Sequence, residues 1–129
     1  MLEKQTQNAS QYLYCAMSIG ECLLASGAEV SRVEDTIHRI CKAFGAERVD
    51  VFTITSSIVV TISSPTFGIL TQTRRIQGME YNMERLEQLN HLSRKICTEN
   101  PMPSLLEIQQ DLKAIEGKQT DSFVKNMLL

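Results

Sequence analysis

The residues best suited to chemistry lie in one stretch, 29–39, which mixes acidic, basic and imidazole side chains. Asp35 and His38 stand three residues apart, a spacing that lets two side chains meet on one face of a helix. A carboxylate beside an imidazole is suited to general acid–base catalysis. A solvated helix face with pairs of opposite charge, such as Asp35 with Arg39, explains the same residues, and it is the interpretation that we favour.

A second polar group occupies residues 71–75, where Thr-Gln-Thr precedes two arginines. An arginine such as Arg74 can hold a carboxylate or a phosphate through two parallel hydrogen bonds, and a hydroxyl such as that of Thr73 can add another. A charged edge strand that resists aggregation has the same composition. The residues alone leave both interpretations open.

No standard cofactor or metal motif accompanies these groups. The chain has no Gly-x-Gly-x-x-Gly run, no Walker loop, no His-x-x-x-His pair and no Gly-x-Ser-x-Gly. Cysteines occur singly within helical patterns, without a Cys-x-x-Cys pair, at Cys15, Cys22, Cys41 and Cys97. They fit small buried apolar residues in a reducing compartment. We therefore expect neither a cofactor nor a metal site.

Length and composition are those of an ordinary globular chain. Its 129 residues, 43% of them hydrophobic and 22% charged, suit one domain with a core of its own. A formal net charge of −2 and the absence of tryptophan give no basis for binding nucleic acid. No run approaches the roughly 18 apolar residues of a membrane helix, and the polar start lacks an export signal. We expect the chain to lie in the cytosol.

Hydrophobic periodicity predicts two helices, three strands and two further helices. In order, these are helices 10–26 and 28–44, strands 49–54, 57–63 and 69–76, and helices 82–98 and 104–117. The strands are rich in β-branched residues, and the third is polar enough for a sheet edge. The predicted fold class is α+β, a small antiparallel three-stranded sheet packed against helices. Residues 1–9 would form a flexible lead-in, 10–117 the domain and 118–129 a tail.

The same periodicity indicates which side chains point inward. Ile58, Val60 and Ile62 share one face of the middle strand. Gly20, in the middle of the first helix, costs about 1 kcal/mol relative to alanine, which a close approach of a second helix would offset. In the third helix the pattern places five residues inward: Leu86, Leu89, Ser93, Ile96 and Cys97.

The most specific motif is the run from Leu23 to Ile37, Leu-Leu-Ala-Ser-Gly-Ala-Glu-Val-Ser-Arg-Val-Glu-Asp-Thr-Ile. It resembles the N-terminal part of the threonine/serine exporter family of bacterial and fungal membrane proteins. Ordered matches cover roughly residues 16–97 of the chain. They include Ala43–Gly45, Val49–Phe52, Ser57–Ile62, Thr71–Ile76 and parts of 82–94.

The resemblance implies a role in transport. Family members carry this hydrophilic domain ahead of a bundle of membrane helices, and in some bacteria a separate small membrane subunit completes the transporter. Such proteins export small amino acids, or dicarboxylates in some relatives. The chain stops at Leu129, about where the first membrane helix of the family would begin, so we interpret it as a truncated exporter on the cytoplasmic side of the cell membrane.

The domain would then serve gating, assembly or substrate sensing, with the membrane helices or the small subunit as its partner, and we also expect a homo-oligomer. The best-matching blocks suggest a surface that binds a small amino acid or dicarboxylate. Its residues would be Glu29, Arg32, Glu34, Asp35, Thr73 and Arg74.

Two other functions stay open. A small hydrolase would need a nucleophile and a base in contact, and Ser56 or Ser57 beside Asp35 and His38 is the combination that the sequence offers. A plain oligomerisation module would instead present an apolar exposed helix face and no pocket.

Overall fold

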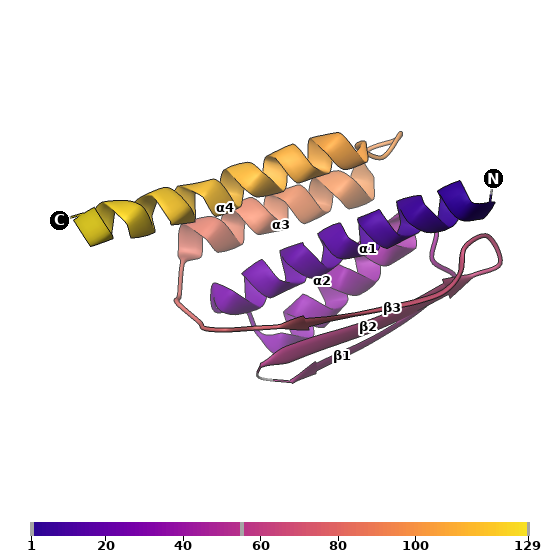
Figure 1. The fold of residues 1–129 in the computed structure, drawn as a ribbon, viewed down its shortest axis with the longest axis horizontal. Coiled ribbons are helices and arrows are strands. Elements are labelled where there is room, and N and C mark those ends of the chain that lie inside the picture. The colour runs from indigo at the N-terminus through magenta and orange to yellow at the C-terminus, as the bar shows by residue number, and fades with distance from the viewer. Residues whose placement is uncertain (1, 55, 129) are drawn as a thin grey trace.

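The protein is built in three layers, with a sheet at the bottom and two pairs of helices stacked above it (Figure 1). The computed structural model describes the backbone of residues 2–54 and 56–128 and the side chains of 6–54 and 56–117. The elements are α1 (Leu2–Ala25), α2 (Val30–Ala43), β1 (Arg48–Ile54), β2 (Ser57–Ser64), β3 (Gly68–Arg75), α3 (Met83–Thr98) and α4 (Leu105–Leu128). This order and the antiparallel sheet confirm the predicted α+β fold class.

The sheet has the order β1-β2-β3, so the polar third strand lies at an edge as predicted. Val60 pairs with Val51 on one side and with Gln72 on the other, which fixes the register of the three strands. Ile58, Val60 and Ile62 are fully buried under α1 and α2, which confirms the predicted inner face. Side chains such as Phe52 and Ile69 point to the other face and are exposed.

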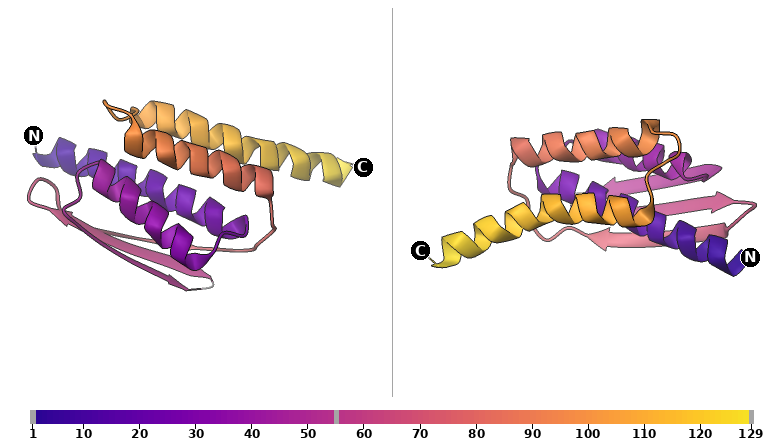
Figure 2. Two further views of the ribbon diagram at one scale, coloured as in Figure 1. Left: turned by 180° about the vertical axis from the view of Figure 1, so that it is seen from behind. Right: turned by 90° about the horizontal axis from the view of Figure 1, so that it is seen from above.

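The helices form two layers above the sheet. Contacts join α1 to β2 and β3, and α2 to β1, so these two helices cover the inner face. Helices α3 and α4 pack against one another and against α1, with α3 also touching α2 (Figure 2). Helix α1 is therefore covered by the sheet on one side and by α3 and α4 on the other.

Two helix boundaries differ from the sequence prediction. Helix α1 begins at Leu2 rather than at Ser10, and α4 runs through Gly117 to Leu128 rather than ending there. The segment before Ser10 contains good helix formers but no apolar stripe, so periodicity gave no signal there. A glycine costs a helix about 1 kcal/mol relative to alanine, which is too little to end it among helix-forming neighbours such as Glu116.

Helix α3 corrects one predicted core position. Asn82 accepts a hydrogen bond from the backbone N–H of Arg85 and caps the helix at the predicted start. The buried apolar residues are Leu89, Leu92 and Ile96, whereas Cys97 is exposed. Steps of three and four residues along the helix continue from Leu89 through Leu92 to Ile96, and Cys97 lies one position off this line.

Gly20 brings α1 and α2 into close contact. An ideal Cβ at Gly20 would lie 2.5 Å from Cδ1 and 2.9 Å from Cγ1 of Ile37, which is fully buried on α2. Such distances are well inside van der Waals contact, so the helices can approach this closely because residue 20 has no side chain. The predicted compensation for a mid-helix glycine is confirmed.

We expect Gly20→Ala to lower the free energy of unfolding by about 1–2 kcal/mol, because overpacking outweighs the gain in helix propensity. Gly117→Ala is the matched control: nothing lies within 4 Å of an ideal Cβ there, so we expect a gain of up to about 1 kcal/mol. Urea unfolding monitored by circular dichroism measures both. If Gly20→Ala also stabilises, or if Gly20→Ala with Ile37→Val is no more stable than Gly20→Ala alone, the close contact does not set the helix spacing.

Candidate functional site

Helix α2 carries four of the six residues predicted to bind a ligand. Glu29 is its N-cap residue, with extended backbone angles and no side-chain hydrogen bond to the first turn. The apolar side of α2 faces the core, with Val33, Ile37 and Ile40 buried. Arg32 and Asp35 lie on the exposed side. Glu34 lies between these sides and is half-buried.

Glu34 ties α2 to the sheet. Its carboxylate accepts a hydrogen bond of 3.0 Å from the backbone N–H of Thr53 on β1. Because β1 is an edge strand, this bond satisfies an amide that the sheet itself does not pair. The hydroxyl of Thr53 is buried without a hydrogen-bond partner at the same place. Glu34 thus has a structural role, joining α2 to β1, that its residue type alone does not reveal.

Asp35 pairs with Arg39 rather than with His38. The Asp35 carboxylate lies 3.0 Å from Nε of Arg39, and both side chains are largely exposed. Among the described residues no hydrogen bond joins Asp35 or His38 to Ser56 or Ser57. The favoured interpretation of this helix face as a solvated surface therefore agrees with the structure.

Arg74 is engaged by α1. Its guanidinium donates to a carboxylate oxygen of Glu21 at 2.6 Å and to Oγ of Ser18 at 3.1 Å. It also lies over the ring of Tyr14, 4.7 Å from the centroid. The ion pair with Glu21, the hydrogen bond to Ser18 and the contact with the Tyr14 ring together engage the guanidinium group. They hold β3 beneath α1.

Thr73 points away from Arg74 because neighbouring residues of a strand face opposite sides of the sheet. Thr73 pairs with Val59 on the outer face and is exposed, while Arg74 pairs with Ile58 on the inner face. The two residues therefore cannot hold one ligand together.

The six predicted residues thus lie in separate places. Glu34 contacts the free edge of β1, and Arg74 lies on β3 at the opposite side of the sheet. Glu29 lines a groove of ≈ 440 Å³ between the start of α2 and the connection that follows β3. Its walls are mainly apolar: Leu24, Ala28, Val30, Ile76, Gln77, Gly78 and Met79. Of the six, only Glu29 lines one of the grooves found among residues 6–54 and 56–117, and that the six form one binding surface stays a prediction.

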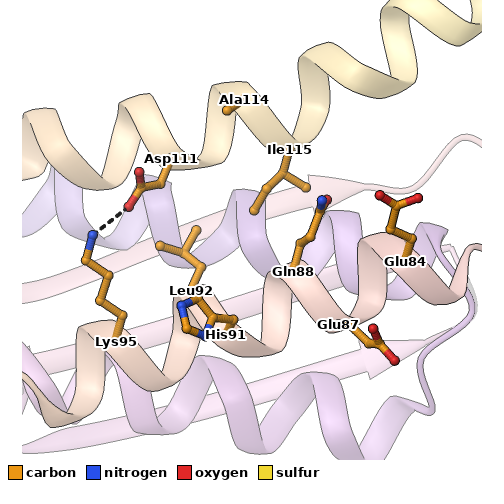
Figure 3. Close-up of a pocket in the computed structure, with 9 residues that line it drawn as sticks. All are labelled: Glu84, Glu87, Gln88, His91, Leu92, Lys95, Asp111, Ala114 and Ile115. Carbon is orange, nitrogen blue, oxygen red and sulfur yellow. Dashed lines mark hydrogen bonds and ion pairs between the residues drawn. The ribbon is translucent and has the colours of Figure 1, made fainter.

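A larger groove, of ≈ 620 Å³, runs between α3 and α4. Figure 3 shows Leu92 and Ile115 facing one another across it, with Lys95 at one end and Glu84 at the other. Lys95 forms ion pairs with Glu107 at 2.9 Å and with Asp111 at 3.0 Å, and hydrogen bonds to these carboxylates raise the pKa of the ammonium group. The positive charge of Lys95 is thereby balanced by two carboxylates, and Glu84 leaves the other end of the groove acidic.

Sequence reasoning missed this groove because its lining comes from two helices that meet only in the fold. It also missed the exposed apolar side chains of the connection between β3 and α3, which include Met79 and Tyr81. The alternation Met-Glu-Tyr-Asn-Met at 79–83 is visible in the sequence and was a usable signal.

The described residues offer no set of three or more His, Cys, Asp or Glu side chains that could hold a metal ion. Cys15, Cys22 and Cys41 are buried. Burial raises the pKa of the Cys41 thiol to about 12, with a smaller effect from Cys97. These thiols behave as small apolar side chains, which is the interpretation that their isolated positions favour.

Comparison with known families decides the chain's membership. The family model for threonine/serine exporters matches residues 14–128. The chain belongs to the threonine/serine exporter family. Neither the search of curated proteins nor that of solved structures finds a match.

The family match extends on both sides of the run from Leu23 to Ile37. It covers the described elements of this exporter-family chain from the middle of α1 to the end of α4. Exporters are membrane proteins. In the part of the chain that the structure describes, no helix combines the length and the apolar character that crossing a bilayer requires.

We expect Arg74→Ala to destabilise the protein by about 1–3 kcal/mol, because it leaves Glu21 without its charged partner and removes the contact with Tyr14. Arg75→Ala is the matched control, since Arg75 is exposed on the outer face, and its effect should stay within about 0.5 kcal/mol. Chemical unfolding compares the two. Equal effects would show that Arg74 does not anchor β3 and would leave it available to a ligand.

We expect one thiol, that of Cys97, to react with an aromatic disulfide reagent in the native protein at pH 8, and all four after denaturation. Cys97 is exposed, whereas the others are shielded by the core and need local opening to react. Absorbance of the released thiolate counts the reactive groups. Unchanged native labelling of Cys97→Ser would contradict the assignment.

Proposed function

We propose that this chain is a cytoplasmic domain of a threonine/serine exporter and that it acts in assembly or gating of the transporter. The observation that carries the proposal is the family match over residues 14–128, which spans the core of the fold. Membrane-embedded helices, either on the same polypeptide or on a separate small subunit, would form the path for the substrate. Self-association of the domain belongs to the same proposal.

Two features of the described residues favour assembly or gating over binding of the transported substrate. Glu34 and Arg74, the predicted ligand residues with the least exposure, already bind the Thr53 amide and the Glu21 carboxylate. A three-layer body in which these polar side chains are already engaged internally is suited to moving as one unit rather than to closing around a small molecule. The substrate would be a small amino acid such as threonine or serine, or a dicarboxylate.

Substrate sensing is the second candidate, and the groove beside Glu29 favours it. The first backbone N–H groups of a helix lack intrahelical acceptors and attract a carboxylate, here at Val30 and Ser31. The Glu29 carboxylate could pair with an ammonium group. An amino acid carries a carboxylate and an ammonium group on one carbon, so a single ligand could make both contacts. Hydrolysis receives less support, because the contact between nucleophile and base that it needs does not occur among the described residues.

The first test of the proposal is efflux. Cells lacking the gene, preloaded with labelled threonine or serine, should release the amino acid more slowly than cells in which the gene is restored. Rates that do not depend on the gene, for either amino acid and for succinate, would contradict an exporter function.

Calorimetric titration of the purified chain with threonine, serine and succinate separates the two candidate roles. Assembly or gating predicts no saturable heat from any of them. Saturable binding that Glu29→Gln abolishes and Glu99→Gln leaves unchanged would overturn this preference and establish sensing, since Glu99 is an exposed glutamate at the far end of α3.

A further inference from the structure

One end of the molecule carries a cluster of exposed apolar side chains, which we call the apolar ridge: Val30, Met79, Tyr81 and Met83. Their exposed fractions are 39%, 70%, 65% and 56%. Met79 and Tyr81 lie in the connection between β3 and α3, Met83 is the first residue of α3, and Val30 is the first residue of α2. Met79 and Val30 line the same groove, and the Tyr81 hydroxyl lies 3.7 Å from the sulfur of Met83. Met79, Tyr81 and Met83 alternate along one short segment, so the two pairs adjoin one another along the chain.

The ridge is held in place by the backbone. Glu80 and Asn82 donate their backbone N–H groups to the carbonyls of Ala25 and Ser26, at 2.8 and 3.0 Å. These two bonds hold the backbone of residues 80–82 against the end of α1 and the turn that follows it. The segment is therefore ordered before any partner arrives, and ordering it on binding costs little.

Tyr81 is fixed further by Gly27. A Cβ at Gly27 would lie 2.8 Å from the Tyr81 ring, and the glycine has a φ of +103°, which side-chain-bearing residues rarely adopt. The turn between α1 and α2 thus provides a seat for one face of the ring, while 65% of the residue stays exposed. A partly exposed tyrosine that packs against a turn is the type of side chain that is enriched at protein interfaces.

The rim of the ridge is acidic. Glu29, Glu80 and Glu84 are exposed around it, and within the described residues none of the three is ion-paired. Arg85, which follows Glu84 directly, is buried and donates to Oγ of Ser26 at 3.3 Å, and Arg32, one turn into α2, is exposed. An anionic lipid surface attracts basic segments, so this rim disfavours a bilayer as the occupant. An apolar partner flanked by lysine or arginine is complementary to the apolar ridge and to the acidic rim.

We propose that the apolar ridge docks a lysine- or arginine-bearing apolar segment of the exporter's membrane-embedded part, at the cytoplasmic end of its helices. This inference rests on the proposed function. Cytoplasmic loops of membrane proteins are enriched in lysine and arginine close to the apolar helices that they join, which is the chemistry that the ridge and its rim fit. Tyr81 and Met79 would supply the apolar contact, and Glu80 and Glu84 the pairing with the bases.

Binding of a synthetic 18-residue leucine/lysine amphipathic helix to the purified chain, followed by fluorescence anisotropy, tests the surface. The double variant Met79→Ser, Tyr81→Ser should weaken binding at least about tenfold, as expected for loss of an interface hot spot. Leu106→Ser with Ile69→Ser is the matched control, because these residues are equally exposed, at 64% and 76%, but lie elsewhere. It should leave binding unchanged.

Charge is tested separately. Glu80→Lys should weaken binding of the lysine helix several-fold and reduce its salt dependence, whereas Glu99→Lys should not. A leucine/glutamate helix should bind at least about tenfold more weakly than the lysine helix. Equal binding of both helices, equal loss in the ridge and control variants, or stronger binding to phosphatidylserine vesicles than to the helix would each overturn the proposal.

A photoreactive phenylalanine analogue at position 81 of the protein in its own cell membrane identifies the natural partner. We expect cross-links to a lysine- or arginine-bearing segment that borders a membrane helix, and none from position 106. Cross-links from position 81 to lipid or to a second copy of this domain would show that the ridge binds that partner instead and would overturn the proposal. The efflux experiment is independent of the ridge: normal efflux with no cross-link would reject the ridge and keep the exporter, and absent efflux would reject the exporter itself.

Discussion

The fold depends on the burial of most of the surface of α1. From Leu13 to Leu24 most residues of this helix are buried, including Ser18 and Gly20; the exceptions are Tyr14, which is exposed, and Glu21, which is half-buried, and Arg74 contacts both. A helix with so much apolar surface is stable only if other elements cover most of it. The sheet and α2 cover one side, and α3 and α4 cover the other. The three layers follow from this single requirement.

The polar anchors serve the same enclosure. Arg74 connects β3 to Ser18 and Glu21 of α1, and Gln72 of the same strand donates its amide to the carbonyl of Ser10. Glu34 performs the equivalent function at the other edge of the sheet by accepting from Thr53. Both edges of the sheet are thus joined to the helices above them by side chains, which limits pairing with strands of other molecules.

Sequence patterns predicted the elements well because they are local. Alternation placed Ile58, Val60 and Ile62 on one face, and the Asn82 cap marked the start of α3. The site was harder, because its contacts join residues far apart in the chain. Glu34 and Thr53 are 19 residues apart and Arg74 and Glu21 are 53 apart, and no local pattern encodes such pairs. Residue types suggested ligand binding where the fold uses the same groups as internal anchors.

The position of α1 also bears on how the protein is made. This helix leaves the ribosome before the elements that enclose it, and α4 follows only after Pro103. At about 5–20 residues per second, roughly 5–20 seconds separate the synthesis of α1 from that of its last covering helix. During that interval the side of α1 that packs against α3 and α4 is not yet fully covered, so the nascent chain exposes apolar surface that a chaperone can hold until the third layer is complete.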